Sequence, residues 1–187
     1  VPRRVVLLAV GKAAPAMAAA ALRALGDLVD EAVVVAPAGL PPEELPAGCR
    51  FLPSAHPVPD ERSLLAGREA LALAAGLGRD DLLVVLLSGG GSSLLALPPE
   101  EVPLADKVRT VSLLAAAGAP VEDVNLVRGA LSRLKGGRLA AAARQADVVT
   151  LVLSDLGDAG WHLVASGPTL GVPPSRRAAA TILETWR

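Results

Sequence analysis

The sequence has very few aromatic residues and only one cysteine. Aromatic side chains make up 2% of the 187 residues and tyrosine is absent, so the core must be built from small aliphatic side chains. The lone Cys49 excludes a framework of disulfide bonds and a cysteine-rich metal site, which is typical of a protein of the reducing cytoplasm. With only His56 and His162 present, we expect no metal site built from histidines.

The sequence also lacks an excess of one charge and a long apolar run. Its formal net charge is −1, so nothing indicates attraction to nucleic acid or to an acidic membrane surface. No stretch approaches the roughly 18 apolar residues of a transmembrane helix. The first apolar segment, Val5–Val10, is too short for the core of a signal peptide. The length and the 52% hydrophobic content suit one substantial domain.

Strand-like and helix-like segments alternate along the chain, which is typical of a layered α/β domain. We expect strands over residues 5–10, 32–35, 50–52, 82–87 and 147–153. Helices are expected at 14–25, 61–75 and 175–186, and a helical stretch broken by glycines begins at Leu104. The predicted fold class is therefore a Rossmann-like α/β domain with a mostly parallel sheet flanked by helices.

The most informative stretch is the apolar run Leu82–Leu87, which leads into Ser88-Gly89-Gly90-Gly91-Ser92-Ser93, the glycine loop. Six consecutive apolar residues predict a strand buried on both faces. Glycines let backbone N–H groups approach a ligand closely, and ligands of open α/β sheets bind outside the carboxyl ends of strands. The glycine loop favours a phosphate or carboxylate, and a plain turn between strand and helix is the alternative.

Three more polar residues follow predicted strands. Lys12 lies in the turn after the first strand, where a lysine suits phosphate binding; a solvent-exposed surface lysine is the alternative. His56 begins a proline-rich loop that ends at Asp60, a good helix N-cap. This loop could hold the imidazole for a ligand or let it cap backbone groups. Asp155 suits a magnesium ligand or a proton acceptor in phosphoryl transfer, but could also cap the turn.

The helical stretch carries a further polar group. Asn125, Arg128 and Ser132 are spaced i, i+3, i+7 and are expected to share one helix face. Asn125 is the only asparagine, which indicates a specific hydrogen-bonding role. Lys135 precedes two glycines, as in an anion-binding turn, and a basic helix end exposed to solvent is the alternative.

Seven motifs, in order over nearly the whole chain, resemble one family. They are Gly11-Lys12-Ala13-Ala14, His56-Pro57-Val58-Pro59-Asp60, Ser88-Gly89-Gly90-Gly91-Ser92, Asn125-Leu126-Val127-Arg128, Lys135-Gly136-Gly137-Arg138-Leu139-Ala140, Ser154-Asp155 and Ala165-Ser166-Gly167-Pro168-Thr169. Together they are similar to the N-terminal domain of class II glycerate 2-kinases, some of which were long named hydroxypyruvate reductases. The resemblance implies that residues 1–187 form that domain and that the family's C-terminal MOFRL domain lies outside this sequence.

The family transfers the γ-phosphate of ATP to the 2-hydroxyl of D-glycerate with Mg²⁺, so the resemblance implies a cytoplasmic kinase that uses both. It makes Lys12 an active-site residue and Asp155 the candidate metal ligand or base. The glycine loop would bind phosphate or the substrate carboxylate, and Asn125, Arg128 and Lys135 would line the same cleft. The expected partners are ATP, D-glycerate and the C-terminal domain, with a homodimer as an option, and without nucleic acid or membrane. The isolated chain is expected to be inactive.

Two local departures from the family's pattern leave other functions open. The usual Val-Arg-Lys-His-Leu-Ser is here Val127-Arg128-Gly129-Ala130-Leu131-Ser132, so a basic residue and a histidine are missing. The usual Ser-Asp-Val-x-Gly-Asp-Asp is here Ser154-Asp155-Leu156-Gly157-Asp158-Ala159-Gly160, in which one acid is lost. These changes would suit a non-catalytic ligand-binding or regulatory domain. A hydroxypyruvate reductase is the third alternative, but no G-x-G-x-x-G turn follows Val5–Val10.

Overall fold

The computed structural model describes residues 2–40, 46–154, 160–171 and 174–187. Its centre is a sheet of five strands in the order β3-β2-β1-β4-β5, and every neighbouring pair is parallel. The strands are β1 (Arg4–Val10), β2 (Glu31–Pro37), β3 (Arg50–Ser54), β4 (Asp81–Ser88) and β5 (Asp147–Leu153). This confirms the predicted fold class, and each strand covers the segment expected for it.

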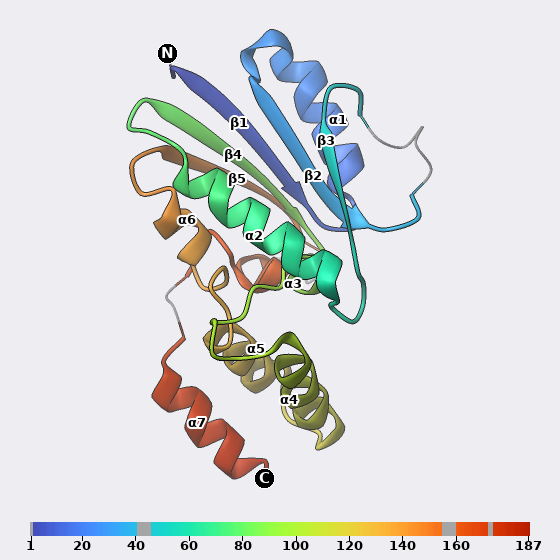
Figure 1. Cartoon of the computed structure of the whole chain (residues 1–187), viewed down its shortest axis with the longest axis vertical. Coiled ribbons are helices and arrows are strands. Elements are labelled where there is room, and N and C mark those ends of the chain that lie inside the picture. Colours follow the sequence, from blue (N-terminus) through green and yellow to red (C-terminus); the bar gives the residue numbers. More distant parts are fainter. Residues whose placement is uncertain (1, 41–45, 155–159, 172–173) are drawn as a thin grey trace.

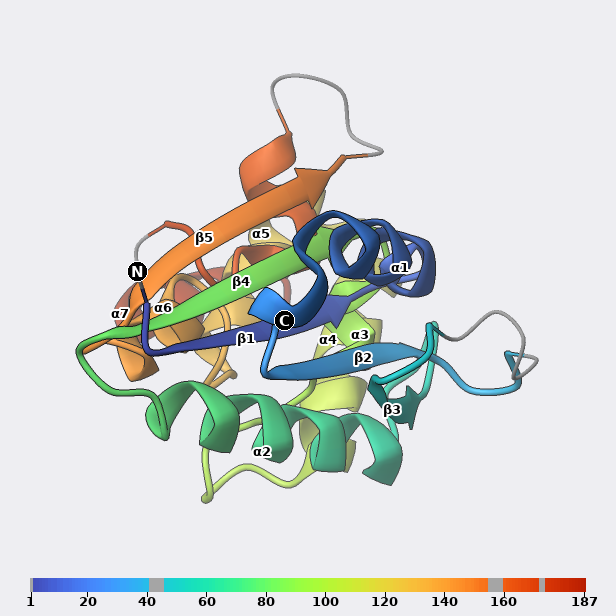
Figure 2. The ribbon, with the colours of Figure 1, turned by 90° about the horizontal axis from the view of Figure 1, so that it is seen from above.

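Helices cover both faces of the sheet, as Figure 2 shows for α1 on one side and α2 on the other. The helical elements are α1 (Ala14–Leu25), η1 (Gly26–Leu28), α2 (Glu61–Ala75), α3 (Gly91–Leu94), α4 (Leu104–Ala116), α5 (Val121–Ala130), α6 (Arg138–Ala142), η3 (Trp161–Ser166) and α7 (Arg176–Thr185). In the part of the chain described, none of these helices has the length and apolarity to cross a membrane.

The alternation of side chains along β1 explains why its sequence is apolar at almost every position. Leu7 and Ala9 pack in the cluster that includes Ala14 and Ala18 of α1. Their neighbours along the strand point to the opposite face and pack in the cluster that contains α2 and α6. A parallel strand covered on both faces has no solvent-facing position, so an unbroken run of aliphatic residues is required.

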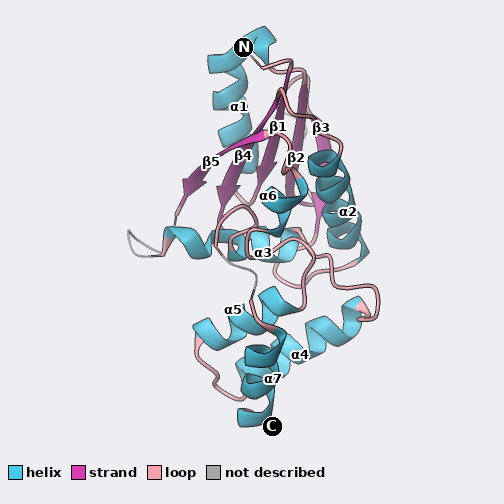
Figure 3. Ribbon diagram, turned by 90° about the vertical axis from the view of Figure 1, so that its left-hand side faces the viewer, coloured by secondary structure: helices cyan, strands magenta, loops and turns pink. Residues whose placement is uncertain are grey.

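Three helices form a second layer beyond the carboxyl ends of the strands (Figures 1 and 3). This helical layer, α4, α5 and α7, has a small core of its own that includes Leu114, Val124, Val127 and Ala179. A glycine break near residue 118 separates α4 from α5, as expected. The layer therefore faces the edge of the sheet where ligands of α/β proteins bind.

One prediction for this layer is wrong. Helix α5 ends at Ala130, so Ser132 does not share a helix face with Asn125 and Arg128. The Ser132 hydroxyl accepts hydrogen bonds from the backbone N–H groups of Leu134 (3.1 Å) and Lys135 (3.3 Å). A serine that bonds to nearby backbone groups competes with the helix ladder, which favours a turn at this point.

Candidate functional site

The polar motifs meet at the carboxyl ends of β1 and β4. The chain runs from β1 outward to β2 and β3, and then returns to place β4 on the other side of β1. Such a reversal of strand order opens a crevice between the loops after the two central strands. Lys12 follows β1 and the glycine loop follows β4, and the Lys12 N–H donates to the carbonyl oxygen of Gly89 at 2.9 Å.

The turn between β1 and α1 is locked by internal hydrogen bonds. The N–H groups of Gly11 and Ala13 donate to the Val35 carbonyl (3.1 Å) and to the Ser88 hydroxyl (3.1 Å). Gly11 has φ +132°, and a Cβ there would lie 2.1 Å from Ser88 Oγ. The buried Ser88 hydroxyl and the first N–H groups of the turn are therefore engaged in hydrogen bonds within the protein.

Gly90 is the point where three motifs touch. It has φ +85°, and a Cβ there would lie 2.9 Å from His56 Cδ2 and 3.2 Å from Lys12 Cγ. Burial, with the charge of Lys12 as a second cause, lowers the pKa of His56, so that its imidazole is neutral at pH 7. A side chain on Gly90 would push the imidazole and the lysine apart, so glycine is required for this close approach.

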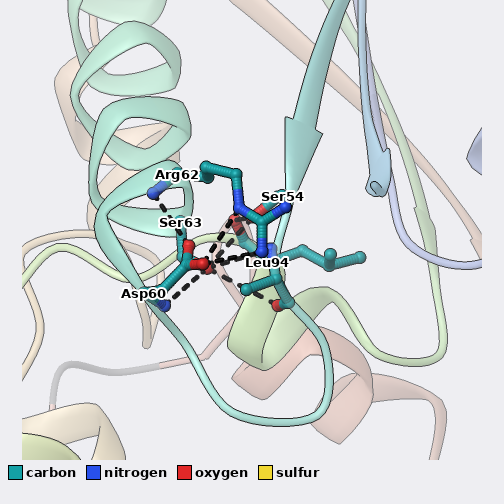
Figure 4. Close-up of polar contacts among 6 residues, drawn as sticks. Ser54, Asp60, Arg62, Ser63 and Leu94 are labelled. Carbon is teal, nitrogen blue, oxygen red and sulfur yellow. Dashed lines mark hydrogen bonds and ion pairs between the residues drawn. The ribbon is translucent and has the colours of Figure 1, made fainter. Parts of the chain in front are cut away.

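Buried hydroxyls fix the loop that carries His56 (Figure 4). Ser54 at the end of β3 donates to the Leu94 carbonyl oxygen at 2.8 Å, and its Oγ lies 3.1 Å from Ser63 Oγ. Asp60 accepts from the Arg62 N–H at 2.8 Å and forms a capping box with Ser63, which confirms the N-cap predicted for α2. These contacts hold the His56 loop against the helix that follows the glycine loop.

Lys135 is buried behind the glycine loop and holds it by hydrogen bonds. Its side chain is 1% exposed, and its ammonium donates to the carbonyl oxygens of Ser92 (2.8 Å), Leu95 (3.3 Å) and Ala165 (3.5 Å). Burial and the charges of Lys107 and Arg128 lower its pKa well below the usual range. The structure thus places Lys135 beneath the candidate site, bound to backbone groups, and not among the residues that line the pocket described below.

The segment Ala165–Pro168 also contacts the glycine loop and the residues that follow Lys135. The N–H groups of Gly136, Gly137 and Leu139 donate to the carbonyl oxygens of residues 166, 167 and 168, at 3.2, 2.8 and 3.0 Å. The hydroxyls of Ser92 and Ser166 are 2.5 Å apart. A Cβ on Gly91 would lie 2.7 Å from the Cβ of Ala165, so the glycine loop and this segment are in direct contact.

A pocket of about 200 Å³ lies between the glycine loop, the His56 loop and the helical layer. None of the described residues that line it carries a carboxylate, and two carry basic side chains. The lining residues are His56, Pro57, Val58, Pro59, Gly90, Ser92, Ser93, Lys107, Val108, Val111, Ser112 and Arg128. An excess of positive charge in a pocket favours an anionic ligand.

Arg128 enters the pocket from α5 with a partner from its own helix. Its Nη1 donates to Oδ1 of Asn125 at 3.0 Å. Burial lowers the pKa of Arg128 from its usual value. Asn125 does not line this pocket, and in the described structure its hydrogen bond orients the guanidinium that does. The specific hydrogen-bonding role indicated by this lone asparagine is therefore observed.

Lys107 is the pocket residue that the sequence reasoning missed. Its side chain is 3% exposed, and its Nζ has no hydrogen-bond partner among the described residues. Burial, with the charge of Arg128 as the second cause, lowers the pKa of Lys107 to about 8. A signal was present in the sequence, because Lys107 is spaced with Leu104, Val108 and Val111 as part of the apolar face of a helix.

The acidic part of the predicted site lies outside the described residues. Asp155, the predicted metal ligand or base, and Asp158 both fall in the segment 155–159. Within the described ranges, no group of three or more His, Cys, Asp or Glu side chains could hold a metal ion.

The chain is similar to proteins of known name over nearly all of its length. A family model described as "Domain of unknown function (DUF4147)" matches residues 1–187. A protein of Agrobacterium vitis named "Putative hydroxypyruvate reductase" is 44% identical over 184 residues, which are 98% of this chain and 41% of that protein. The "D-glycerate 2-kinase" of Thermotoga maritima is 40% identical over 98% of this chain and 44% of its own length.

Solved structures agree with the sequence comparison. A crystal structure of glycerate kinase from Thermotoga maritima superposes with a TM-score of 0.87 at 42% identity, covering 98% of this chain and 44% of that one. The chain therefore spans less than half the length of these relatives.

Proposed function

This chain belongs to the DUF4147 family, and from that membership and the cationic pocket we propose that the protein carrying it is an ATP-dependent glycerate 2-kinase. In the proposed reaction the 2-hydroxyl oxygen of D-glycerate bonds to the γ-phosphorus of ATP as the bond from that phosphorus to the β–γ bridging oxygen breaks. ADP leaves, and the hydroxyl proton is released to solvent. The observation that supports this best is a small pocket with one buried and one partly buried cation, at the strand-order reversal of a sheet shared with named glycerate kinases.

The size and lining of the pocket suit a small hydroxy acid. Its volume of about 200 Å³ is below the roughly 300–1,000 Å³ of pockets for drug-sized ligands. Phosphoryl transfer needs positioning and positive charge more than covalent chemistry. Arg128 supplies charge, while Ser93 and the neutral imidazole of His56 offer polar groups to the substrate hydroxyls. Lys12, beside Gly90, is proposed to contact the transferred phosphate.

In this proposal ATP supplies the phosphoryl group, and we expect Mg²⁺ to bind together with it. The described residues do not fit a magnesium site, because they offer no carboxylate to the pocket and no cluster of candidate ligands. We therefore assign no step to the metal, and Asp155 as its ligand stays a prediction. The cytoplasmic location, the homodimer and the inactivity of the isolated chain also stay predictions.

The names of two relatives raise the reductase alternative, but the β1–α1 turn argues against it. Dinucleotides bind such a turn through free backbone N–H groups, which glycines expose. Here the N–H groups of Gly11, Lys12 and Ala13 already donate to protein oxygens. The Ser88 hydroxyl fills the space beside Gly11. The N–H groups of Gly11, Lys12 and Ala13 are therefore not free to bind a pyrophosphate.

The sequence departures at Gly129 and Ala130 do not remove a group from the pocket. A Cβ on Gly129 would lie 2.6 Å from Cγ of Pro174, so this position faces a proline on the other side of α5. Ala130 is buried and is not among the residues that line the Lys107–Arg128 pocket. These substitutions therefore give little support to a loss of catalysis.

A coupled assay of ADP release by the full-length protein with D-glycerate tests the proposal. We expect turnover in the wild type and a loss of roughly 100-fold or more in Lys12→Ala, because a cation beside the transferred phosphate is removed. Arg23→Ala, an exposed cation at the other end of α1, is the matched control and should keep wild-type activity. Absence of turnover, or oxidation of NADH with hydroxypyruvate instead, would overturn the kinase proposal.

A further inference from the structure

Lys107 is held in an environment that opposes its charge in three ways. It is 3% exposed, and its ammonium has no hydrogen-bond partner among the described residues. Arg128 is close enough for its like charge to lower the pKa of Lys107. Lys107 also lies at the end of the first turn of α4, where the helix dipole favours negative charge. A protein that only needed packing at this position would be more stable with an apolar side chain.

A comparison with Lys135 shows that this arrangement is specific to the pocket. Lys135 is equally buried, but three carbonyl oxygens accept hydrogen bonds from its ammonium. Both lysines lie in the same electrostatic neighbourhood, since the charge of Lys107 is one of the causes that lower the pKa of Lys135. Only Lys107 lines the pocket, and only Lys107 lacks the oxygen atoms that a buried ammonium requires.

The missing oxygens must come from outside the described residues. Lys107 and Arg128 line the same pocket, and none of the described lining residues carries a carboxylate. An oxyanion with two oxygen atoms can satisfy the ammonium and the guanidinium together, because charge-assisted hydrogen bonds to both are short and strong. Asn125 fixes one partner of this pair in advance, through its hydrogen bond to Arg128.

We propose that Lys107 and Arg128 form the subsite for the carboxylate of the hydroxy-acid substrate, and that Lys107 makes the site select an acid over a neutral polyol. This inference rests on the proposed function. It adds which part of the substrate these two residues bind, namely its carboxylate. The apolar side chains of Val108 and Val111 line the same pocket beside these two cations. The hydroxyl to be phosphorylated then points toward the glycine loop and Lys12.

The test compares D-glycerate with D-glyceramide, its neutral isostere, in the full-length protein. Lys107→Met should lower kcat/KM for D-glycerate by roughly 10- to 100-fold, the loss of one charge-assisted contact, and leave kcat/KM for D-glyceramide within about twofold. The KM for ATP should not change. Lys107→Arg should restore part of the preference for the acid. Arg109→Gln, an exposed cation two residues further along α4, is the matched control.

Thermal unfolding supplies a readout that a purely structural lysine would not give. Without ligand, Lys107→Met should raise the Tm by about 4 °C or more, because it removes an uncompensated buried charge. Added D-glycerate should raise the Tm of the wild type and have a much smaller effect on the variant. A lower Tm in Lys107→Met would show that the rest of the protein pairs with this ammonium, and would overturn the proposal.

The remaining outcomes separate this inference from the proposed function. An equal loss on both substrates, no loss on either, or a loss confined to the KM for ATP overturns the carboxylate subsite while the kinase proposal stands. If the wild type turns over neither substrate, the kinase proposal fails. Calorimetric binding of D-glycerate to the wild type and to Lys107→Met then decides this inference by itself, since it needs no turnover. Tenfold weaker binding to the variant supports it, and equal binding overturns it.

Discussion

The two walls of the pocket are built in opposite ways. On the sheet side, hydrogen bonds within the protein fix the β1–α1 turn, the His56 loop and the glycine loop. On the side of the helical layer, Lys107 has no partner among the described residues and Arg128 has Asn125 alone. The difference teaches that internal hydrogen bonds fix the loops of the sheet wall, while the helical wall keeps the charge of Lys107 and Arg128 available for a ligand.

The comparison predicts different responses to substitution. The sheet wall is close-packed at Gly11 and Gly90, so changes that disturb this packing should reduce stability and disrupt the pocket with it. The helical wall carries an uncompensated charge, so neutralising it should increase stability while function is lost. This is the trade-off between stability and activity that functional sites often show.

The largest effect should come from the sheet wall at Gly11. Gly11→Ala would place a Cβ 2.1 Å from Ser88 Oγ at φ +132°, and we expect it to lower the free energy of unfolding by about 4 kcal/mol or more. Gly118→Ala is the control, because Gly118 also has a positive φ but nothing lies within 4 Å of its Cβ position. It should cost about 1 kcal/mol. Denaturant unfolding measures both, and equal losses would contradict the close packing argued for this wall.

The next largest effect should separate the two buried lysines. Lys135→Met leaves three buried carbonyl oxygens without their donor, and we expect it to lower the free energy of unfolding by about 3 kcal/mol. Lys107→Met is expected to change stability in the opposite direction. If both substitutions destabilise the protein to the same degree, the distinction between the walls fails.

A smaller effect should appear in the dependence of stability on pH. The pKa of Lys107 is lowered to about 8 in the folded protein, so between pH 8 and 10 the unfolded chain binds more protons than the folded one. Stability should therefore rise with pH over this range, and the rise should be about 2 kcal/mol smaller in Lys107→Met.

The other charged groups near Lys107 do not oppose this difference. An arginine side chain such as Arg128 stays protonated over this range, and His56 across the pocket, whose pKa is lowered, is already neutral. The lowered pKa of Lys135 makes stability rise with pH in both proteins. Because the charge of Lys107 is one of its causes, the substitution does not enlarge this contribution, so any change at Lys135 acts in the same direction as the loss of Lys107. Identical pH profiles of urea unfolding for wild type and variant would show that Lys107 is not buried in its charged form.

The smallest effect is expected at Asp60, which belongs to the conspicuous proline-rich motif but caps α2. Asp60→Ala removes the hydrogen bond to the Arg62 N–H and should cost about 1 kcal/mol. The kcat/KM for D-glycerate should stay within about twofold, because Asp60 does not line the pocket. A large loss of activity without a loss of stability would assign Asp60 to the site instead.

Sequence reasoning predicted the sheet wall well because its signals are local. The apolar run Leu82–Leu87, the helix Glu61–Ala75 and its N-cap Asp60 are each specified by neighbouring residues, and the structure has them at those places. The convergence of Lys12 with the glycine loop also follows from a general rule for parallel sheets. These features could be predicted without knowledge of the tertiary contacts.

The helical wall was harder to predict because burial there depends on how α4 packs against α5. Lys107 is one of 18 basic residues, and only its tertiary position makes it unusual. Lys135 before two glycines resembles an anion site, but its oxygen partners come from residues 43, 40 and 30 positions away in the chain. A local pattern shows that a lysine is near glycines and does not show which oxygens it meets.

The contacts that Lys135 and Ala165–Pro168 make with the glycine loop also have a consequence for synthesis of the protein. A ribosome that has released the chain as far as Ala130 has already delivered four of the five strands, together with Lys107 and Arg128. The residues that brace the glycine loop, Lys135 and Ala165–Pro168, emerge later. We therefore expect the nascent sheet to form first and to wait with an unsupported glycine loop, so that competence to bind an anion is acquired late in translation.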